Sequence, residues 1–261
     1  MQCAASLALS YMDIVDCARL STTSGELRAC LKGLVANSLV TRRLGSTLFR
    51  AALEANAHLL YIDVSQAYHL TDSAFQEIGR ICRLVTTVKA AHCFRLVDVS
   101  LRGASSLECV DFTGCSSIDH TTVLRLLDAN LALRRVSFGN CYNICNACVR
   151  SIANLPLIRQ IHLGNCPNVR ALKTLALESL QSLDLTGSDV LDDISFEVLL
   201  RSCRALDRFW ARCCGLLTTR AVRHLIAATT PSSLMDLRDC VELLHLTNVR
   251  REGLVILLGH S

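Results

Sequence analysis

The sequence predicts an α/β fold: a right-handed solenoid, or horseshoe, of about eight repeats, with short parallel strands on the concave side and helices outside. Three observations predict it. A nine-residue phrase with apolar residues at positions 1, 4 and 6 and a small residue, mostly cysteine, at position 9 occurs eight times. Successive copies are 22 to 26 residues apart, and a helical apolar pattern follows most of them. One strand and one helix cannot bury both apolar faces alone, so the units must stack.

Each phrase predicts a short strand. The copy formed by Leu133, Val136, Phe138 and Cys141 shows the alternating apolar residues of a strand with one open face. We call position 9 the cysteine slot. It contains Ala67, Cys93, Cys115, Cys141, Cys166, Ser188, Cys214 and Cys240. We expect the slot to point inward, where a free cysteine behaves as a small apolar residue.

A polar residue after the slot predicts the start of each helix. Thr71-Asp72, Asp119 and Thr219 precede apolar residues at helical spacing, as N-cap residues do. The 22-residue spacings that follow Cys93 and Cys166 leave room only for a shortened helix.

The two ends of the chain depart from the repeat. Residues 1–57 lack the phrase, and apolar patterns over 6–20, 28–40 and 44–55 predict a small helical module that caps a repeat domain of residues 58–261. At the other end, Leu254 and Leu257 begin a ninth phrase, or residues 248–258 form a capping helix. Either would cover the apolar face of the last repeat.

The phrase with its Thr-Asp-like cap resembles the cysteine-containing leucine-rich repeats of F-box proteins, over about residues 59 to 245. The departures are Ala67 and Ser188 in the slot and a weak last repeat from Ser232. The resemblance implies a substrate receptor of a cullin-type ubiquitin ligase. Residues 10–21 resemble the second half of an F-box, without its opening Leu-Pro motif and most of its first helix. The N-terminal module is therefore a degenerate or truncated F-box, which would bind a Skp-type adaptor through residues 6–31, or an unrelated cap.

Composition limits the compartment and the partners. Because six of the 15 cysteines occupy one inward repeat position, we expect reduced thiols and an intracellular reducing compartment. The cytoplasm is the first choice; the mitochondrial matrix and the cilium are alternatives. No apolar run approaches ~18 residues, so no membrane span is expected. The 27 basic and 23 acidic residues form no dense basic run, which argues against nucleic-acid binding except within a larger ribonucleoprotein.

One motif suggests a cofactor. The spacing of Cys141, Cys145 and Cys148 matches the cluster ligands of radical-SAM enzymes, but Cys141 already belongs to the slot, and Ala147 replaces the usual aromatic residue. We therefore expect no cluster, and no zinc at these cysteines with His162. The eight histidines occupy unrelated repeat positions, so a hydrolytic triad would need unconnected surface points. We expect neither catalysis nor a cofactor.

Binding is better supported by the pattern. One residue of each phrase, between positions 4 and 6, must point out of the open concave face; we call these residues the concave column. They are Asp63, Lys89, Asp111, Ser137, His162, Asp184, Trp210 and Asp236. With strands ~4.8 Å apart, eight residues span roughly 34 Å, enough for a helix or an extended peptide. The flanking positions add Tyr61, Arg135, Gln160, Arg208 and Arg212.

Trp210 is the sharpest binding candidate. It is the single Trp, and Arg208 and Arg212 lie on the same face two residues to either side. An exposed Trp among Arg residues is typical of a binding hot spot, and cation–π stacking would hold it in place. The alternative for Trp210 is that the C-terminal tail covers it. The alternative for the aspartates of the concave column is that they form a solvated polar face that binds no ligand. The candidate protein-binding residues are Tyr61, Asp111, Arg135, His162, Asp184, Arg208, Trp210, Arg212 and Asp236.

Two Gly-Asn pairs, Gly139-Asn140 and Gly164-Asn165, are interpreted as turn residues, with close approach of a partner as the alternative. The sequence thus predicts protein–protein recognition without catalysis. By resemblance, the first interpretation is a substrate-recognition subunit of an F-box/cullin-type ubiquitin ligase. The alternative is a structural scaffold subunit of an axonemal, mitochondrial or ribonucleoprotein assembly. The identity of the partner is not encoded in any motif.

Overall fold

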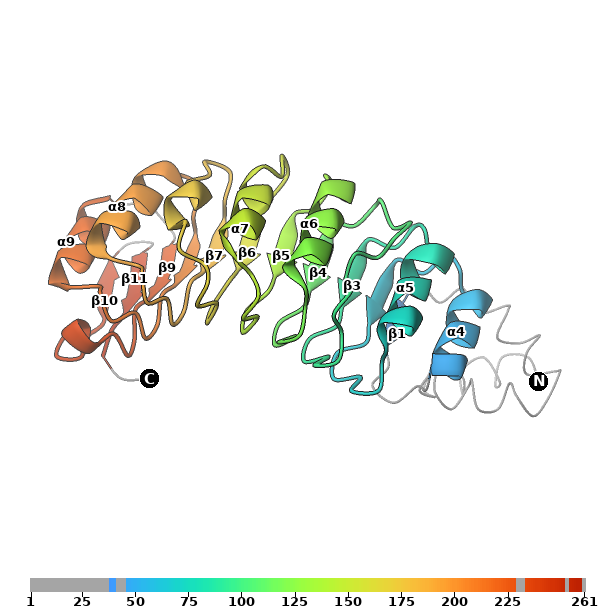
Figure 1. Ribbon diagram of the computed structural model, residues 1–261. Helices are drawn as coiled ribbons and strands as arrows, with labels where there is room; N and C mark the ends of the chain where they lie inside the picture. Colours follow the sequence, from blue (N-terminus) through green and yellow to red (C-terminus); the bar gives the residue numbers. More distant parts are fainter. Residues whose placement is uncertain (1–37, 41–45, 229–232, 252–253, 260–261) are drawn as a thin grey trace, which may run out of the picture.

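The computed structural model describes residues 38–40, 46–228, 233–251 and 254–259. They form an elongated, curved stack with one continuous sheet and with helices along the outer side of the arc (Figure 1). The N-terminal end of the arc begins with β1 and α4, and the C-terminal end finishes with a β-hairpin. No helix in the described ranges is long and apolar enough to cross a membrane.

The sheet confirms the predicted parallel solenoid. The strands are β1 (Ser38–Val40), β2 (Tyr61–Asp63), β3 (Thr87–Lys89), β4 (Cys109–Asp111), β5 (Arg135–Ser137), β6 (Gln160–His162), β7 (Ser182–Asp184), β8 (Arg208–Trp210), β9 (Ser233–Asp236), β10 (Val249–Arg251) and β11 (Leu254–Leu257). Strands β1 to β9 lie side by side in chain order, followed by β11 and β10. All neighbours are parallel except β10 and β11.

The helices follow the strands as expected. They are α4 (Ser46–Ala55), α5 (Asp72–Ile81), α6 (His120–Ala129), α7 (Asn146–Ala153), α8 (Asp193–Ser202) and α9 (Thr219–Ala228), with the 3₁₀ helices η1 (Leu172–Leu175) and η2 (Val241–Leu243). The sequence predicts a shortened helix for both short spacings. The connection from β6 to β7 has one, the 3₁₀ helix η1, whereas the described connection from β3 to β4 contains no helix. A Cβ at Gly79 of α5 would lie 2.5 Å from the Leu101 carbonyl oxygen, so this glycine lets the shortened connection pack directly on the helix.

Two of the three predicted N-caps are confirmed. The side chain of Thr71 accepts a hydrogen bond from the Ala74 N–H, and that of Asp119 accepts one from the Thr121 N–H. Thr219 is instead the first residue of α9, and the hydroxyl of the preceding Thr218 accepts from the backbone two residues later. The sequence places this helix start one residue late because two threonines stand together.

The cysteine slot is buried, and its thiols form a ladder. Each slot cysteine donates a hydrogen bond to the position-6 carbonyl of the preceding repeat, with sulfur–oxygen distances of 3.0 to 3.5 Å. The pairs are Cys93–Val64, Cys115–Ala90, Cys141–Phe112, Cys166–Phe138, Cys214–Leu185 and Cys240–Ala211. Ala67 is also buried, whereas Ser188 is half-buried, so this slot is less enclosed than the others. Ser188 comes after β7, the strand that follows the shortened connection with η1.

The residue before the slot has a left-handed backbone in all eight repeats. These residues are Gln66, His92, Gly114, Asn140, Asn165, Gly187, Cys213 and Asp239, with φ between 55° and 73°. The N–H of each donates to a carbonyl of the next repeat at 2.6 to 3.1 Å. The turn interpretation of Asn140 and Asn165 is therefore confirmed. Glycine is required at position 139 for a different reason: a Cβ there would lie 2.5 Å from Nε2 of His162.

The N-terminal end differs from the prediction. Most of the expected helical module, including the adaptor segment 6–31, lies outside the described residues. The helix expected over 44–55 is present as α4. Residues 38–40, expected in a helical segment, instead form β1, with Leu39 opposite Ile62, so the sheet begins one repeat earlier. The sequence pattern does not reveal this copy of the phrase, because Thr41 stands at position 6, where the other copies have an apolar residue.

The C-terminal end is a hairpin, so the predicted capping helix over 248–258 is wrong. Strand β11 pairs parallel to β9 and supplies the strand expected of a ninth phrase. Its register is shifted by one residue, because Ile256 rather than Leu257 lies opposite Met235. Strand β10 then runs antiparallel beside β11 and ends the sheet.

Candidate protein-binding site

The strand register brings the concave column together as predicted. Its eight residues are register partners in consecutive strands, from Asp63 opposite Lys89 to Trp210 opposite Asp236. A groove of about 320 Å³ opens at the centre of this face, across β3 to β8. It is lined by Lys89, Cys109, Asp111, Arg135, Val136, Ser137, Gln160, Ile161, His162, Ser182, Asp184 and Trp210. The other candidate residues, Tyr61, Arg208, Arg212 and Asp236, do not line it.

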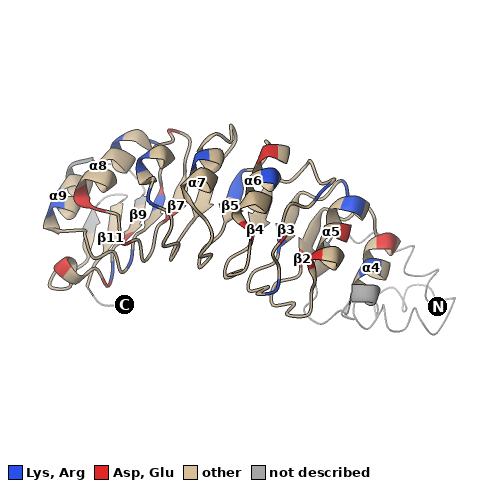
Figure 2. Ribbon diagram, in the orientation of Figure 1, with Lys and Arg blue, Asp and Glu red and all other residues tan. Residues whose placement is uncertain are grey.

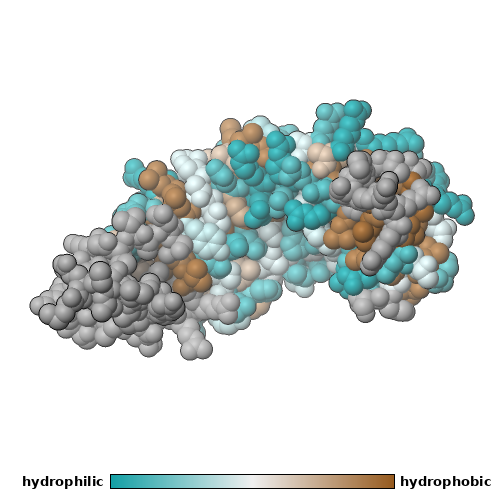
Figure 3. Space-filling view, turned by 180° about the vertical axis from the view of Figure 1, so that it is seen from behind, coloured by the Kyte–Doolittle hydropathy of each residue, from teal (hydrophilic) through white to brown (hydrophobic). Residues whose placement is uncertain are grey.

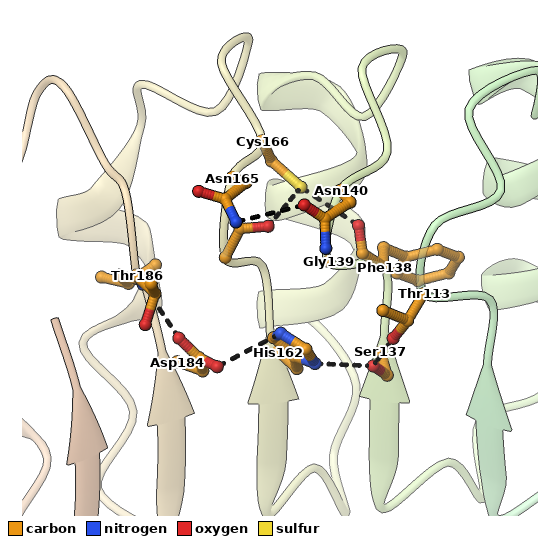
Figure 4. A network of polar contacts seen from close by, with 12 residues as sticks. Thr113, Ser137, Phe138, Gly139, Asn140, His162, Asn165, Cys166, Asp184 and Thr186 are labelled. Carbon is orange, nitrogen blue, oxygen red and sulfur yellow. Dashed lines mark hydrogen bonds and ion pairs between the residues drawn. The ribbon is translucent and has the colours of Figure 1, made fainter. Parts of the chain in front are cut away.

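A chain of polar contacts crosses the floor of the groove (Figure 4). The hydroxyl oxygens of Thr113 and Ser137 lie 2.6 Å apart, and Ser137 Oγ lies 2.9 Å from Nδ1 of His162. Nε2 of His162 lies 3.2 Å from Oδ2 of Asp184, whose Oδ1 accepts from the Thr186 N–H at 2.8 Å. The expectation that such groups lie at unconnected points is therefore wrong for Ser137, His162 and Asp184. They occupy the same strand position in three consecutive repeats.

This chain has the connectivity of a serine–histidine–aspartate relay. Ser137, however, is only 8% exposed, and its oxygen already lies between Thr113 and the imidazole ring. Mutually satisfied polar groups in a partly buried site hold one another in one orientation. We infer that the network fixes the side chains on the groove floor and so prepares the surface for a ligand.

The aspartates of the concave column have a structural role that the sequence analysis misses. Each accepts a hydrogen bond from the backbone N–H two residues later, at 2.8 to 3.2 Å. The acceptors are Asp63, Asp111, Asp184 and Asp236. This local bond caps the end of the strand, as Asx turns do. The signal is visible in the sequence as Asp-x-Ser or Asp-x-Thr in three of the four cases.

The arginines near Trp210 do not stack on it. Arg212 pairs with Asp239 at 2.9 Å, and Arg208 lies 3.6 Å from Asp207. Within the described residues, the recorded cation–π contact is Lys89 over Tyr61, 5.4 Å from the ring centroid. The predicted Arg–Trp stacking is therefore wrong, because each arginine has a carboxylate partner.

Trp210 and Asp236 have different environments. Trp210 is half-buried and lines one end of the groove. The described part of the C-terminal tail continues the sheet as β11, beside β9. Asp236 is only 3% exposed, and Arg238 holds it with hydrogen bonds of 2.9 and 2.7 Å. Trp210 therefore remains available at the groove, whereas Asp236 is occupied within its own repeat.

The groove carries both charges. Lys89 lies beside Tyr61, whose hydrogen bond raises the pKa of this lysine, and Arg135 donates to Gln160 Oε1 at 2.7 Å. Asp111 and Asp184 supply the negative charges. Figure 2 shows positive and negative residues interspersed along the arc, and Figure 3, seen from behind, shows hydrophilic residues among smaller hydrophobic areas along the molecule. A ligand would therefore be recognised chiefly by hydrogen bonds and charge.

The three cysteines of the candidate cofactor motif do not converge. Cys141 belongs to the thiol ladder, whereas Cys145 and Cys148 lie at the start of α7, and His162 lies on the concave strand β6. In the part of the chain that the structure describes, no group of three His, Cys, Asp or Glu residues could hold a metal ion.

No protein-family model matches the chain. Among solved structures, it is similar to an internalin from Listeria monocytogenes (14% identity, 86% of this chain and 88% of that chain, TM-score 0.46). It is also similar to a chain of the yeast Rad7–Elc1 complex (11%, 81% and 72%, TM-score 0.42). A third similar structure is the functional domain of InlJ from Listeria monocytogenes, which includes a cysteine ladder (12%, 77% and 39%, TM-score 0.43). These likenesses carry no argument about function.

The repeat geometry itself defines the fold. The phrase recurs every 22 to 26 residues, its strands pair in parallel and in register, and helices occupy the outer side. The chain therefore has a leucine-rich repeat fold.

Proposed function

We propose that this protein is a protein-recognition module that binds a segment of another protein in its concave groove and performs no catalysis. The observation that carries the proposal is the groove across β3 to β8, whose floor is held in place by the Ser137–His162–Asp184 network. Six strands span roughly 24 Å, which matches an extended segment of about seven residues. The groove side chains, rather than a free sheet edge, would supply specificity.

We further propose that the partner is a substrate of a ubiquitin ligase. The resemblance of the repeats to those of F-box proteins supports this role, as does the partial F-box resemblance of residues 10–21. A Skp-type adaptor would then bind through residues 6–31. The buried free thiols of the slot favour a reducing compartment such as the cytoplasm. The second candidate is a scaffold subunit of a large assembly, in which the same concave groove would hold a neighbouring subunit.

Affinity capture of the full chain, followed by mass spectrometry, tests whether the protein binds a partner and whether that partner belongs to a ubiquitin ligase or to a large assembly. Recovery of a Skp-type adaptor and a cullin supports the ligase role, and stoichiometric recovery in one large particle supports the scaffold role. To test the groove itself, Trp210→Ala is compared with Arg201→Ala, an exposed helical residue far from the concave face.

Trp210→Ala is expected to weaken binding of the captured partner by about 2 kcal/mol or more, because a half-buried Trp contributes a large contact area. Arg201→Ala is expected to change partner binding little, because the Arg201 side chain is solvent-exposed on α8. Equal affinity of wild type and Trp210→Ala, measured by calorimetry with the identified partner, would remove Trp210 from the site.

A further inference from the structure

The function proposed above leaves one cysteine pair unused. Cys145 and Cys148 are separated by two residues and lie at the start of α7. The structure separates them from Cys141, whose thiol donates to the Phe112 carbonyl in the slot ladder. The three-cysteine motif seen in the sequence is therefore one structural thiol followed by an independent Cys-x-x-Cys pair.

The two cysteines of this pair lie within one helical turn of each other. Cys145 is the N-cap residue of α7, and Cys148 is the third residue of the helix. These are the two positions that a capping box joins, and a disulfide can span that separation. The Cys148 thiol donates to the His120 carbonyl oxygen at 3.9 Å, a long contact that holds it only weakly. Cys145 makes no side-chain capping bond, unlike the N-cap residues Thr71, Asp119 and Asp192.

The pair also has the exposure expected of an exchanging dithiol. Cys145 is half-buried and accessible from solvent, whereas Cys148 is fully buried. Burial raises the pKa of Cys148 to about 11, and the more exposed Cys145 is therefore the thiol that an external disulfide meets first. The slot cysteines donate to carbonyls of the preceding repeat at 3.0 to 3.5 Å, which is shorter than the 3.9 Å contact from Cys148 to His120. Cys213 is exposed, but its neighbour Cys214 belongs to the slot ladder.

We propose that Cys145 and Cys148 form a redox-active dithiol that exchanges with low-molecular-weight disulfides to give a reversible internal disulfide. The Cys145 thiolate attacks one sulfur of glutathione disulfide, forms a mixed disulfide and releases one glutathione. Cys148 then loses its proton and attacks the Cys145 sulfur, which releases the second glutathione. Two cysteine thiols are oxidised, one disulfide is reduced to two thiols, and the two protons pass to the released glutathione thiolates.

The disulfide would act at a joint between repeats. Asn146, between the two cysteines, accepts hydrogen bonds from the N–H groups of Arg170 and Ala171, both at 2.8 Å. These residues lead into η1 of the next repeat. A change at the first turn of α7 is therefore transmitted directly to the neighbouring repeat.

The test is differential alkylation and mass spectrometry of the full-length native protein after incubation with glutathione disulfide. One tryptic peptide, residues 136–150, carries Cys141, Cys145 and Cys148, and fragmentation locates the bond. In wild type we expect a Cys145–Cys148 disulfide, with Cys141 alkylated only after denaturation. Dithiothreitol should restore both thiols.

Three variants make the result specific. Cys148→Ala should retain one glutathione on Cys145, because the resolving thiol is gone. Cys145→Ser, which places a good capping residue at the N-cap, should leave Cys148 unmodified. Cys213→Ser is the matched control and should oxidise at the pair as wild type does.

Two outcomes would overturn the proposal. One is a Cys145 thiol in Cys148→Ala that stays free while Cys213 becomes glutathionylated. The other is a wild-type pair that forms its disulfide only in denaturant. If Cys148→Ala loses the native circular dichroism spectrum, the wild-type result alone decides. A Cys145–Cys148 disulfide in the native wild-type protein then supports the proposal, and its absence overturns it.

Discussion

At the scale of the residue, each slot cysteine has two roles. Its side chain fills a small buried space, and its thiol donates to a carbonyl of the preceding repeat. Alanine would fill part of the space without a donor, and serine would bring a hydroxyl that is more costly to bury. The slot therefore favours cysteine because sulfur combines apolar character with a weak donor.

Cys141→Ala tests this role. We expect a loss of about 1–3 kcal/mol in unfolding free energy, from the cavity and the missing thiol bond. The Phe112 carbonyl would keep its bond from the Cys115 N–H, so the loss should not be larger. Urea denaturation measures the change. Cys213→Ala, at an exposed position, should stay within about 0.5 kcal/mol of wild type.

Gly139→Ala tests how the His162 ring is held. A Cβ at this position would lie 2.5 Å from Nε2 of His162, so the ring must shift, and its 3.2 Å contact with Asp184 must change. We expect a changed imidazole chemical shift in NMR spectra and weaker partner binding with the repeat fold intact. In the control Gly215→Ala, the added Cβ meets no atom within 4 Å. An unchanged His162 resonance in Gly139→Ala would contradict the proposed packing.

At the scale of the element, side chains at the start of several helices bond to the next repeat, in addition to the strand pairing of the sheet. Asp193 in the first turn of α8 accepts from the Thr218 N–H at 2.9 Å, and also from the Thr218 hydroxyl. The bond joins α8 to the start of α9. Asp72 on α5 makes the same kind of bond to the Val97 N–H at 2.9 Å.

Asp193→Ala should lower the unfolding free energy by about 1–3 kcal/mol, because it leaves the Thr218 N–H without its charged acceptor. The matched control is Asp189→Ala. Asp189 is an exposed aspartate 3.7 Å from Arg170, and its removal should cost less than about 1 kcal/mol. Chemical denaturation measures the unfolding free energy of both variants. Equal losses of unfolding free energy would show that the inter-repeat bond contributes no more than a surface ion pair.

At the scale of the whole molecule, the buried thiols couple stability to pH. Burial raises the pKa of Cys93 and Cys166 to about 11, and that of Cys115 and Cys214 to about 12, from an ordinary value of 9.0. About two pH units below 9.0 these thiols are neutral in both the folded and the unfolded chain. Between their unfolded and folded pKa values, the unfolded chain loses protons that the folded chain keeps.

Stability should therefore be constant from about pH 6.5 to 8.5 with respect to these thiols and fall steeply above pH 9, by about 1.4 kcal/mol per pH unit for each affected thiol. Urea denaturation at pH 7.5, 9.5 and 10.5 under reducing conditions measures this decline. A midpoint that stays the same up to pH 10.5 would contradict the burial of the slot.

The elements predicted from the sequence agree with the structure in the middle of the chain and differ from it at the two ends. In the middle, the concave column was predictable because every copy of the phrase sets the same register. At the N-terminal end, β1 is hidden because Thr41 replaces an apolar residue in its phrase. At the C-terminal end, the hairpin arises because β11 pairs with β9 in a register shifted by one residue.

The sequence by itself determined the repeat, the inward cysteines and the row of outward side chains, because a periodic position has the same neighbours in every unit of a stack. Only the tertiary structure decided which outward side chains bind one another. The Ser137–His162–Asp184 network and the Arg212–Asp239 pair join residues about one repeat apart, and their formation depends on side-chain directions. Periodicity places such residues side by side, but the local geometry decides which atoms meet.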